Sequence, residues 1–137
     1  MSRKYTRKFN PIPVVDTSNG PRSERETITH LTVEVVYSKG GNIMGRHAAR
    51  GWSLHVQPTT MYTTEDGVSM TRYSPRDGVR MFIHEAGRYS SGQADKAEAK
   101  AVCELRRIVE HIINTQPIEV SSALFEDIEE YVFGGAA

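Results

Sequence analysis

Residues 30–58 read HLTVEVVYSKGGNIMGRHAARGWSLHVQP, and their pattern decides the fold. Apolar residues occupy every second position of two segments, namely Leu31, Val33, Val35 and Tyr37, then Trp52, Leu54 and Val56. This alternation is typical of strands that bury one face. The residues between the two segments are rich in glycine and basic side chains. The stretch therefore predicts two strands joined by a projecting loop, where binding residues tend to concentrate.

Two further strands are predicted on either side of Asp66-Gly67, over residues 59–64 and 68–73. An Asp-Gly pair tolerates the positive φ angles of a tight hairpin turn. Pro58 lacks a backbone N–H, so we expect it to end or bend the preceding strand.

Three helices are predicted in the second half of the chain. Ser74 and Pro75 offer an N-cap and a first helical position, and apolar residues at helical spacing continue the pattern to Gly87. A long amphipathic helix is expected over residues 93–114, before Pro117. The last helix, residues 122–133, carries an acidic face. Its glutamates would either bind a basic partner surface or simply be exposed to solvent.

These elements predict an α+β fold: a four-stranded antiparallel sheet followed by two to three helices, with the long helix packed on the sheet. We divide the chain into a basic extended arm (1–29), an α+β domain (30–116) and an acidic C-terminal helix and tail (117–137). The arm is expected to be mobile, although Ile12, Val14 and Val15 would also suit an edge strand docked on the domain or on a partner.

Charge is distributed unevenly along the chain of 137 residues, whose formal net charge is zero. Residues 1–50 carry nine Lys/Arg and four Asp/Glu, whereas residues 91–137 carry four and nine. Such asymmetry suits a basic binding surface, an assembly of several copies, or attraction between the two ends within one fold. Neither a signal peptide nor an apolar run long enough to span a bilayer is visible, so we expect a cytoplasmic protein without membrane contact.

The glycine-rich loop is the first candidate site. Its glycines would let the backbone approach an anion, and Lys39, Asn42, Arg46, His47 and Arg50 would supply charge and hydrogen bonds. The loop lacks the Gly-Lys-Ser/Thr ending of a P-loop. The alternative is a hairpin connection whose glycines serve only the turn.

No complete catalytic or metal motif is present, and we expect no enzyme activity and no cofactor. The single cysteine, Cys103, excludes a disulfide framework. The five histidines show no metal-ligand spacing. If the first two strands pair, His55 lies beside Glu34. That pair suits a general base or, more simply, an ordinary cross-strand contact.

Aromatic and basic residues interleave on the predicted sheet. Tyr62 and Arg72 would stack bases and contact phosphates on an exposed face, assisted by the basic arm. Trp52 suits this role less well, because its strand pattern points it into the core. The neutral net charge also argues against a dedicated nucleic-acid binder.

Three stretches, Tyr37-Ser-x-Gly-Gly, Arg50-Gly-Trp-x-Leu-x-Val-x-Pro58 and the helix after residue 90, resemble a group of uncharacterised small proteins from phages and mobile elements. The resemblance implies no established activity, only a genomic setting in which small accessory proteins bind and neutralise host defence components. The element order is also similar to the PC4-like single-strand DNA-binding fold, which works as a dimer.

We therefore expect a non-enzymatic, homo-oligomeric accessory protein that binds and modulates a host defence protein. Single-stranded nucleic-acid binding is the first alternative, and binding of a nucleotide or another small ligand is the second. The residues expected to form the binding surface are Lys39, Asn42, Arg46, His47, Arg50, His55, Tyr62 and Arg72.

Overall fold

The fold joins one layer of strands to one layer of helices. A computed structural model describes residues 6–18, 26–43, 46–48, 50–63, 66–73 and 78–134, with the backbone alone at residues 26, 41–43, 46–48, 62–63, 69 and 71–73. The elements are β1 (Thr6–Lys8), β2 (Ile12–Pro13), β3 (Val15–Asp16), β4 (Glu26–Ser38), β5 (Gly41–Ile43), β6 (Arg46–Ala48), β7 (Gly51–Thr63), β8 (Ser69–Tyr73), β9 (Val79–Glu85), α1 (Ser91–Thr115), β10 (Ile118–Glu119), α2 (Ser122–Glu126) and the π-helical turn η3 (Glu130–Gly134). The α+β class is thus confirmed.

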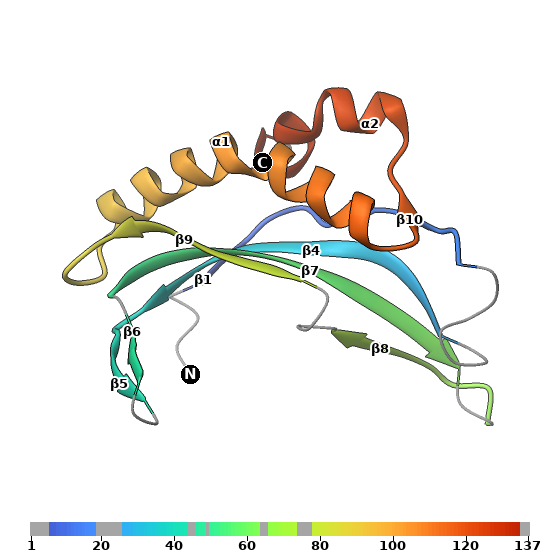
Figure 1. The fold of residues 1–137 in the computed structure, drawn as a ribbon, viewed down its shortest axis with the longest axis horizontal. Helices are drawn as coiled ribbons and strands as arrows, with labels where there is room; N and C mark the ends of the chain where they lie inside the picture. Colours follow the sequence, from blue (N-terminus) through green and yellow to red (C-terminus); the bar gives the residue numbers. More distant parts are fainter. Residues whose placement is uncertain are drawn as a thin grey trace.

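The main sheet is built around the long antiparallel pair of β4 and β7, which runs from Glu26↔Tyr62 to Ser38↔Gly51. β1 and β2 follow one another along the outer edge of β4, while β8 and β9 do the same along β7. Counted over the described residues, the sheet has six strands, not the four expected, but is only four strands wide. Figure 1 shows it as an arch with α1 and α2 on the convex side.

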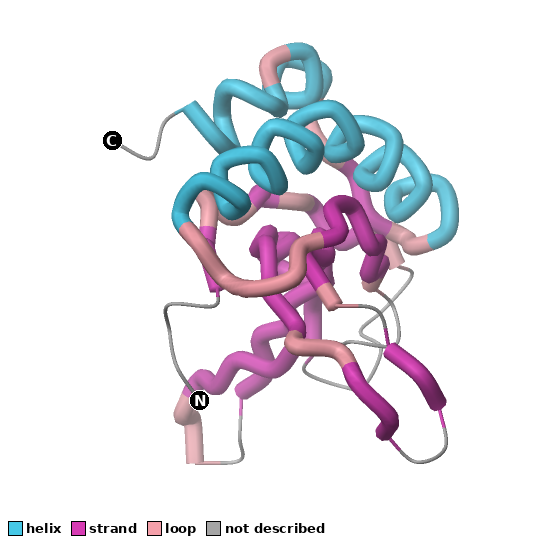
Figure 2. The backbone as a smooth tube through the Cα atoms, turned by 90° about the vertical axis from the view of Figure 1, so that its left-hand side faces the viewer, coloured by secondary structure: helices cyan, strands magenta, loops and turns pink. Residues whose placement is uncertain are grey.

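The core lies between the sheet and α1. The apolar positions predicted in β4 and β7 are buried on the convex side, including Trp52 at 0% and Tyr37 at 7% exposure. From α1 the buried residues are Ala94, Ala97, Ala101, Leu105, Ile108, Val109 and Ile112. The small alanines let the first half of the helix approach the strands closely. Seen from the side, the helices form one layer, and the β5–β6 hairpin points away from them (Figure 2).

The helix predicted up to Gly87 is wrong, because residues 79–85 form the strand β9. The apolar residues of this segment fit both the strand period of two and the helical period of 3.6. Val79, Met81 and Ile83 occupy every second position, and Val79 and Ile83 also lie about one helical turn apart. The neighbouring edge of β7 decides the outcome, since it supplies partners for every residue of β9 except Ile83, which forms a bulge. Long-range pairing overrides the local pattern here.

Of the two expected effects of Pro58, ending or bending its strand, the first does not occur. It lies inside β7 and opposite Leu31 of β4. On the other edge of β7, the pairing with β9 reaches only Val56 and the pairing with β8 starts at Thr59. Pro58, which lacks a backbone N–H, thus lies where the hydrogen-bond ladder on this edge of β7 is already interrupted. The hairpin at Asp66-Gly67 is confirmed: Thr63 pairs with Ser69, and Gly67 has a φ of 85°.

The long helix is confirmed as α1. The side chain of Ser90 accepts a hydrogen bond from the backbone N–H of Gln93, as an N-cap residue should. At the other end the N–H of Gln116 donates to the carbonyl of Ile112 before Pro117 follows. The last predicted helix is interrupted, with α2 ending at Glu126 and η3 following.

The described parts of the expected arm, residues 6–18 and 26–29, are extended and joined to the folded domain, and residues 26–29 form the start of β4. Ile12 in β2 is fully buried opposite Leu31 of β4. This arrangement corresponds to the alternative in which the arm docks on the domain as an edge strand. The backbone N–H of Asn10 donates to the carbonyl of Val132 at 3.3 Å, and β3 pairs with β10. The first and last described segments of the chain therefore lie side by side.

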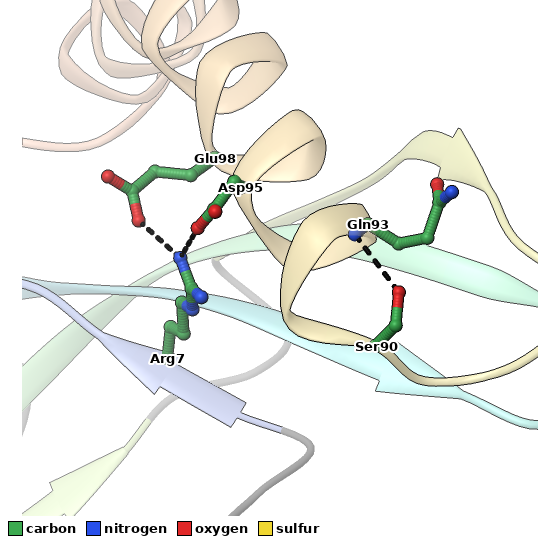
Figure 3. A network of polar contacts seen from close by, with 5 residues as sticks. All are labelled: Arg7, Ser90, Gln93, Asp95 and Glu98. Atoms are coloured by element: carbon green, nitrogen blue, oxygen red, sulfur yellow. Dashed lines mark hydrogen bonds and ion pairs between the residues drawn. The ribbon is translucent and has the colours of Figure 1, made fainter.

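Opposite charges at distant points of the chain meet directly. Nη1 of Arg7 lies 2.8 Å from Oδ1 of Asp95 and 3.0 Å from Oε1 of Glu98, which joins β1 to α1 (Figure 3). Arg106 donates to both carboxylate oxygens of Glu129, and this lowers the pKa of Glu129. The contacts of Arg7 support the reading in which the basic and acidic ends of the chain attract each other within one fold, whereas the Arg106–Glu129 pair lies within the acidic end.

Candidate binding face

The polar side chains of β4 and β7 share the face of the sheet that is turned away from α1. Because side chains alternate along a strand, burial of the odd positions of β4 and the even positions of β7 leaves the intervening residues on the other side. We call this surface the concave face. Its described central residues are Thr32, Glu34, Ser53, His55, Gln57 and Arg80.

Four ionisable residues form a continuous row across the concave face. Lys8 of β1 lies opposite Glu34 of β4, Glu34 opposite His55 of β7, and His55 opposite Arg80 of β9. Neighbouring strands lie about 4.8 Å apart, so this charged row is about 14 Å long between its outer backbones. Its outer members are basic and its inner members are a carboxylate and an imidazole.

His55 and Glu34 do not form a hydrogen bond. Nδ1 of His55 lies 3.9 Å from Oε1 of Glu34, beyond hydrogen-bonding distance. Burial lowers the pKa of His55, and the nearby Arg80 lowers it further. His55 is therefore uncharged at neutral pH, and its contact with Glu34 is then polar without being a salt bridge. The geometry resembles an ordinary cross-strand pair more than an oriented general base.

A pocket of about 470 Å³ opens beside the charged row, between the β1–β2 edge and the centre of the sheet. It is lined by Lys8, Phe9, Pro11, His30, Thr32, Val33, Glu34 and Gln57. Gln57 is 8% exposed, so its amide is held at the pocket wall. The size suits one or two side chains of a partner or a small polar ligand.

The far side of the charged row carries an exposed aromatic ring. Phe82 is 46% exposed and pairs with Ser53, two residues along β9 from the pairing of Arg80 with His55. A Cβ atom at Gly51 would lie 3.0 Å from Cζ of Phe82 and 2.3 Å from the carbonyl oxygen of His84. Gly51, whose φ is 151°, thus lets the aromatic ring and the β9 backbone approach the start of β7.

The predicted glycine-rich loop is a short hairpin of β5 and β6, in which Asn42 pairs with His47 and Ile43 with Arg46. The side chains of Asn42, Arg46, His47, Tyr62 and Arg72 lie outside the described residues. Their proposed roles therefore stay predictions.

The side chain of Arg50 donates hydrogen bonds to two backbone carbonyls of the protein. Its Nε donates to the carbonyl of Lys39 at 2.8 Å, and its Nη1 donates to the carbonyl of Gly87 at 3.0 Å. The guanidinium joins both ends of the β5–β6 excursion to the turn after β9. Two N–H donors of Arg50 are thus committed within the protein and anchor the ends of the hairpin.

Sequence reasoning placed Glu34, His55 and Gln57 on the polar sides of their strands but missed Lys8, Arg80 and Phe82 as members of this face. Lys8 belongs to a segment assigned to the arm, and Arg80 and Phe82 to a segment assigned to a helix. The alternation of Val79, Met81 and Ile83 with Arg80 and Phe82 was the signal that could have placed them on a strand.

Within the described ranges, no three His, Cys, Asp or Glu side chains gather as metal ligands would. Among the helices of that same part, none is long and apolar enough to cross a bilayer. Comparison with protein families, curated proteins and solved structures gave no match for this chain.

Proposed function

We propose that this chain is a non-enzymatic accessory protein of a phage or mobile element that binds a host defence protein through the concave face. The genomic setting comes from the resemblance of residues 37–41 and 50–58 to such proteins. The choice of surface comes from the charged row, which is the observation that carries the proposal.

Mixed charge along the row favours a protein partner. Lys8 and Arg80 would pair with two carboxylates about 14 Å apart, while Glu34 between them would pair with a basic side chain. A nucleic-acid backbone presents only negative charge, and Glu34 at the middle of the row would repel it. Complementary patterns of both signs give specificity between protein surfaces.

The adjacent pocket adds a place for an anchoring side chain. Its wall combines the aliphatic Val33 and Pro11 with polar groups of Thr32 and Gln57. Binding energy at protein interfaces concentrates where such a pocket is filled and water is excluded. We place the centre of the interface at this pocket and the charged row at its rim.

The test is a charge exchange that leaves the net charge unchanged. Lysate of candidate host cells is passed over immobilised wild type, the K8E/E34K variant and a K96E/E126K control, which exchanges two exposed charges of the helix layer. The proposal predicts one stoichiometric partner that the wild type and the control retain and that K8E/E34K binds at least about tenfold more weakly. If all three chains retain the partner equally, the concave face is not the binding surface.

Single-stranded nucleic-acid binding is the second candidate, favoured by the adjacency of Phe82 and Arg80. An exposed ring beside a guanidinium suits base stacking with a phosphate contact. This candidate predicts fluorescence anisotropy with labelled single-stranded DNA that falls steeply as salt rises, and that is weakened in R80A/F82A. Absence of binding at low salt would rule it out.

A further inference from the structure

The outer edge of β9 carries no partner strand among the described residues. β9 pairs with β7 on one side, and no other strand of the described ranges pairs with its second side. An edge strand of seven residues presents unpaired N–H and C=O groups that can take a further strand. Charged residues and bulges protect many natural edges, and β9 carries Arg80, Glu85 and a bulge at Ile83. An apolar groove runs beside this edge.

This groove lies between β9 and α1 and has a volume of about 380 Å³. Met81, Phe82 and Ile83 line it from the strand, and Ala99, Cys103 and the aliphatic stem of Lys100 line it from the helix. Glu104 and Arg107, which contact each other, close its remaining side. The edge thus offers both backbone groups and apolar surface.

We propose that β9 pairs with β9 of a second copy of this chain, antiparallel and about a twofold axis, so that Arg80 of each copy faces Glu85 of the other. Charge complementarity selects this occupant, because β9 carries one basic and one acidic residue near its opposite ends. The twofold axis then forms the ion pair twice.

The distribution of side chains between the two faces fixes the same register. Arg80 and Glu85 pair with His55 and Gly51, which share the concave face, whereas Met81 and His84 pair with Leu54 and Trp52 on the helix side. This symmetry arises because the bulge at Ile83 shifts the pattern by one residue.

Placing Arg80 opposite Glu85 of the second copy also places Met81 opposite His84, with like faces together. Phe82 of each copy then lies opposite Ile83 of the other at the twofold axis, where the bulge interrupts the alternation. A register moved by one residue would set Arg80 opposite His84, and so oppose side chains from different faces.

The resulting assembly is one continuous sheet. Met81 and Ile83 of both copies would fill the two apolar grooves beneath a pair of neighbouring α1 helices. The two charged rows would lie in line on a single concave surface. This inference does not depend on what that surface binds, because it rests on the edge of β9 alone.

The test uses the full chain, whose mass is 15.3 kDa, and the charge reversals R80E and E85R. Sedimentation equilibrium should give a dimer for the wild type and at least about tenfold weaker association for either single variant. R80E and E85R mixed in equal amounts should dimerise again, because each copy then meets the opposite charge. E126K reverses one exposed charge of α2 and should associate like the wild type.

Folding of each variant is checked by the fluorescence of Trp52, which lies in the core. The proposal would be overturned if the wild type stays monomeric at about 100 μM, a concentration well above the dissociation constants of stable dimers. Single variants that associate like the wild type, or a mixture that fails to recover, would also overturn it.

Discussion

The two faces of the β4–β7 pair are made by alternating residues of the same strands and differ in almost every physical property. The convex face buries Trp52, Leu54 and Val56 under α1 at 0% exposure. The concave face sets Ser53, His55 and Gln57 between them. One residue of displacement along a strand thus separates a position that stabilises the fold from one that is free to serve recognition.

The difference shows where changes in sequence should have structural or functional effects. Substitutions on the convex face remove buried apolar surface, so they should reduce the free energy of unfolding. Substitutions on the concave face change charge and hydrogen bonding at the surface, so they should alter binding and pH response while the fold persists.

The largest expected effect contrasts the neighbours Trp52 and Ser53. Trp52 packs against Tyr37 and Tyr89, with ring centroids 5.4 and 5.6 Å away, and Trp52→Ala should lower the free energy of unfolding by about 3–5 kcal/mol. Ser53→Ala, one position along on the other face, should change it by less than about 0.5 kcal/mol. Urea unfolding followed by circular dichroism measures both; similar losses for the two would contradict the comparison.

The convex face was predictable because its signal is local. The alternation in residues 31–37 and 52–56 and the helical spacing in residues 93–114 each specify one period over several residues. Residues 79–85 carry two periods at once, so only the edge of β7, distant in sequence, decides between them. Ile12 of β2 is a similar case, since nothing around it in the chain shows that β4 will be its partner.

The concave face was less predictable because it is assembled from four strands. His55 and Glu34 come from the two strands whose pairing the sequence indicated, and they were placed together correctly. Lys8 and Arg80 join them only through β1 and β9, whose pairing depends on contacts across the whole chain. A row that crosses a sheet leaves no spacing in the sequence to detect.

A smaller effect separates the neighbours Arg7 and Lys8 of β1. Arg7 faces α1 and contacts Asp95 and Glu98, so Arg7→Ala should cost about 0.5–1 kcal/mol at low salt and less at high salt. Lys8 faces the concave side, and Lys8→Ala should leave the free energy of unfolding nearly unchanged. Denaturation at two salt concentrations tests this, and a larger loss for Lys8→Ala would reverse the assignment of faces.

The smallest effect concerns the protonation of His55. Burial and the charge of Arg80 place its pKa in the folded state below the value of 6.5 expected for an unperturbed histidine. Below pH 6.5 the unfolded chain therefore binds the proton more readily than the folded one. The contribution of neutral His55 to stability is complete above that pH and is lost as the pH falls through the folded-state pKa. His55→Gln should accordingly flatten the decline in unfolding free energy between pH 7.5 and 5.5, whereas the same change at the exposed His111 of α1 provides the control.

An NMR titration of the His55 ring in the wild type and in Arg80→Ala isolates the contribution of the Arg80 charge to the pKa shift of His55. The pKa should rise when Arg80 is removed, and an unchanged value would show that burial alone sets it.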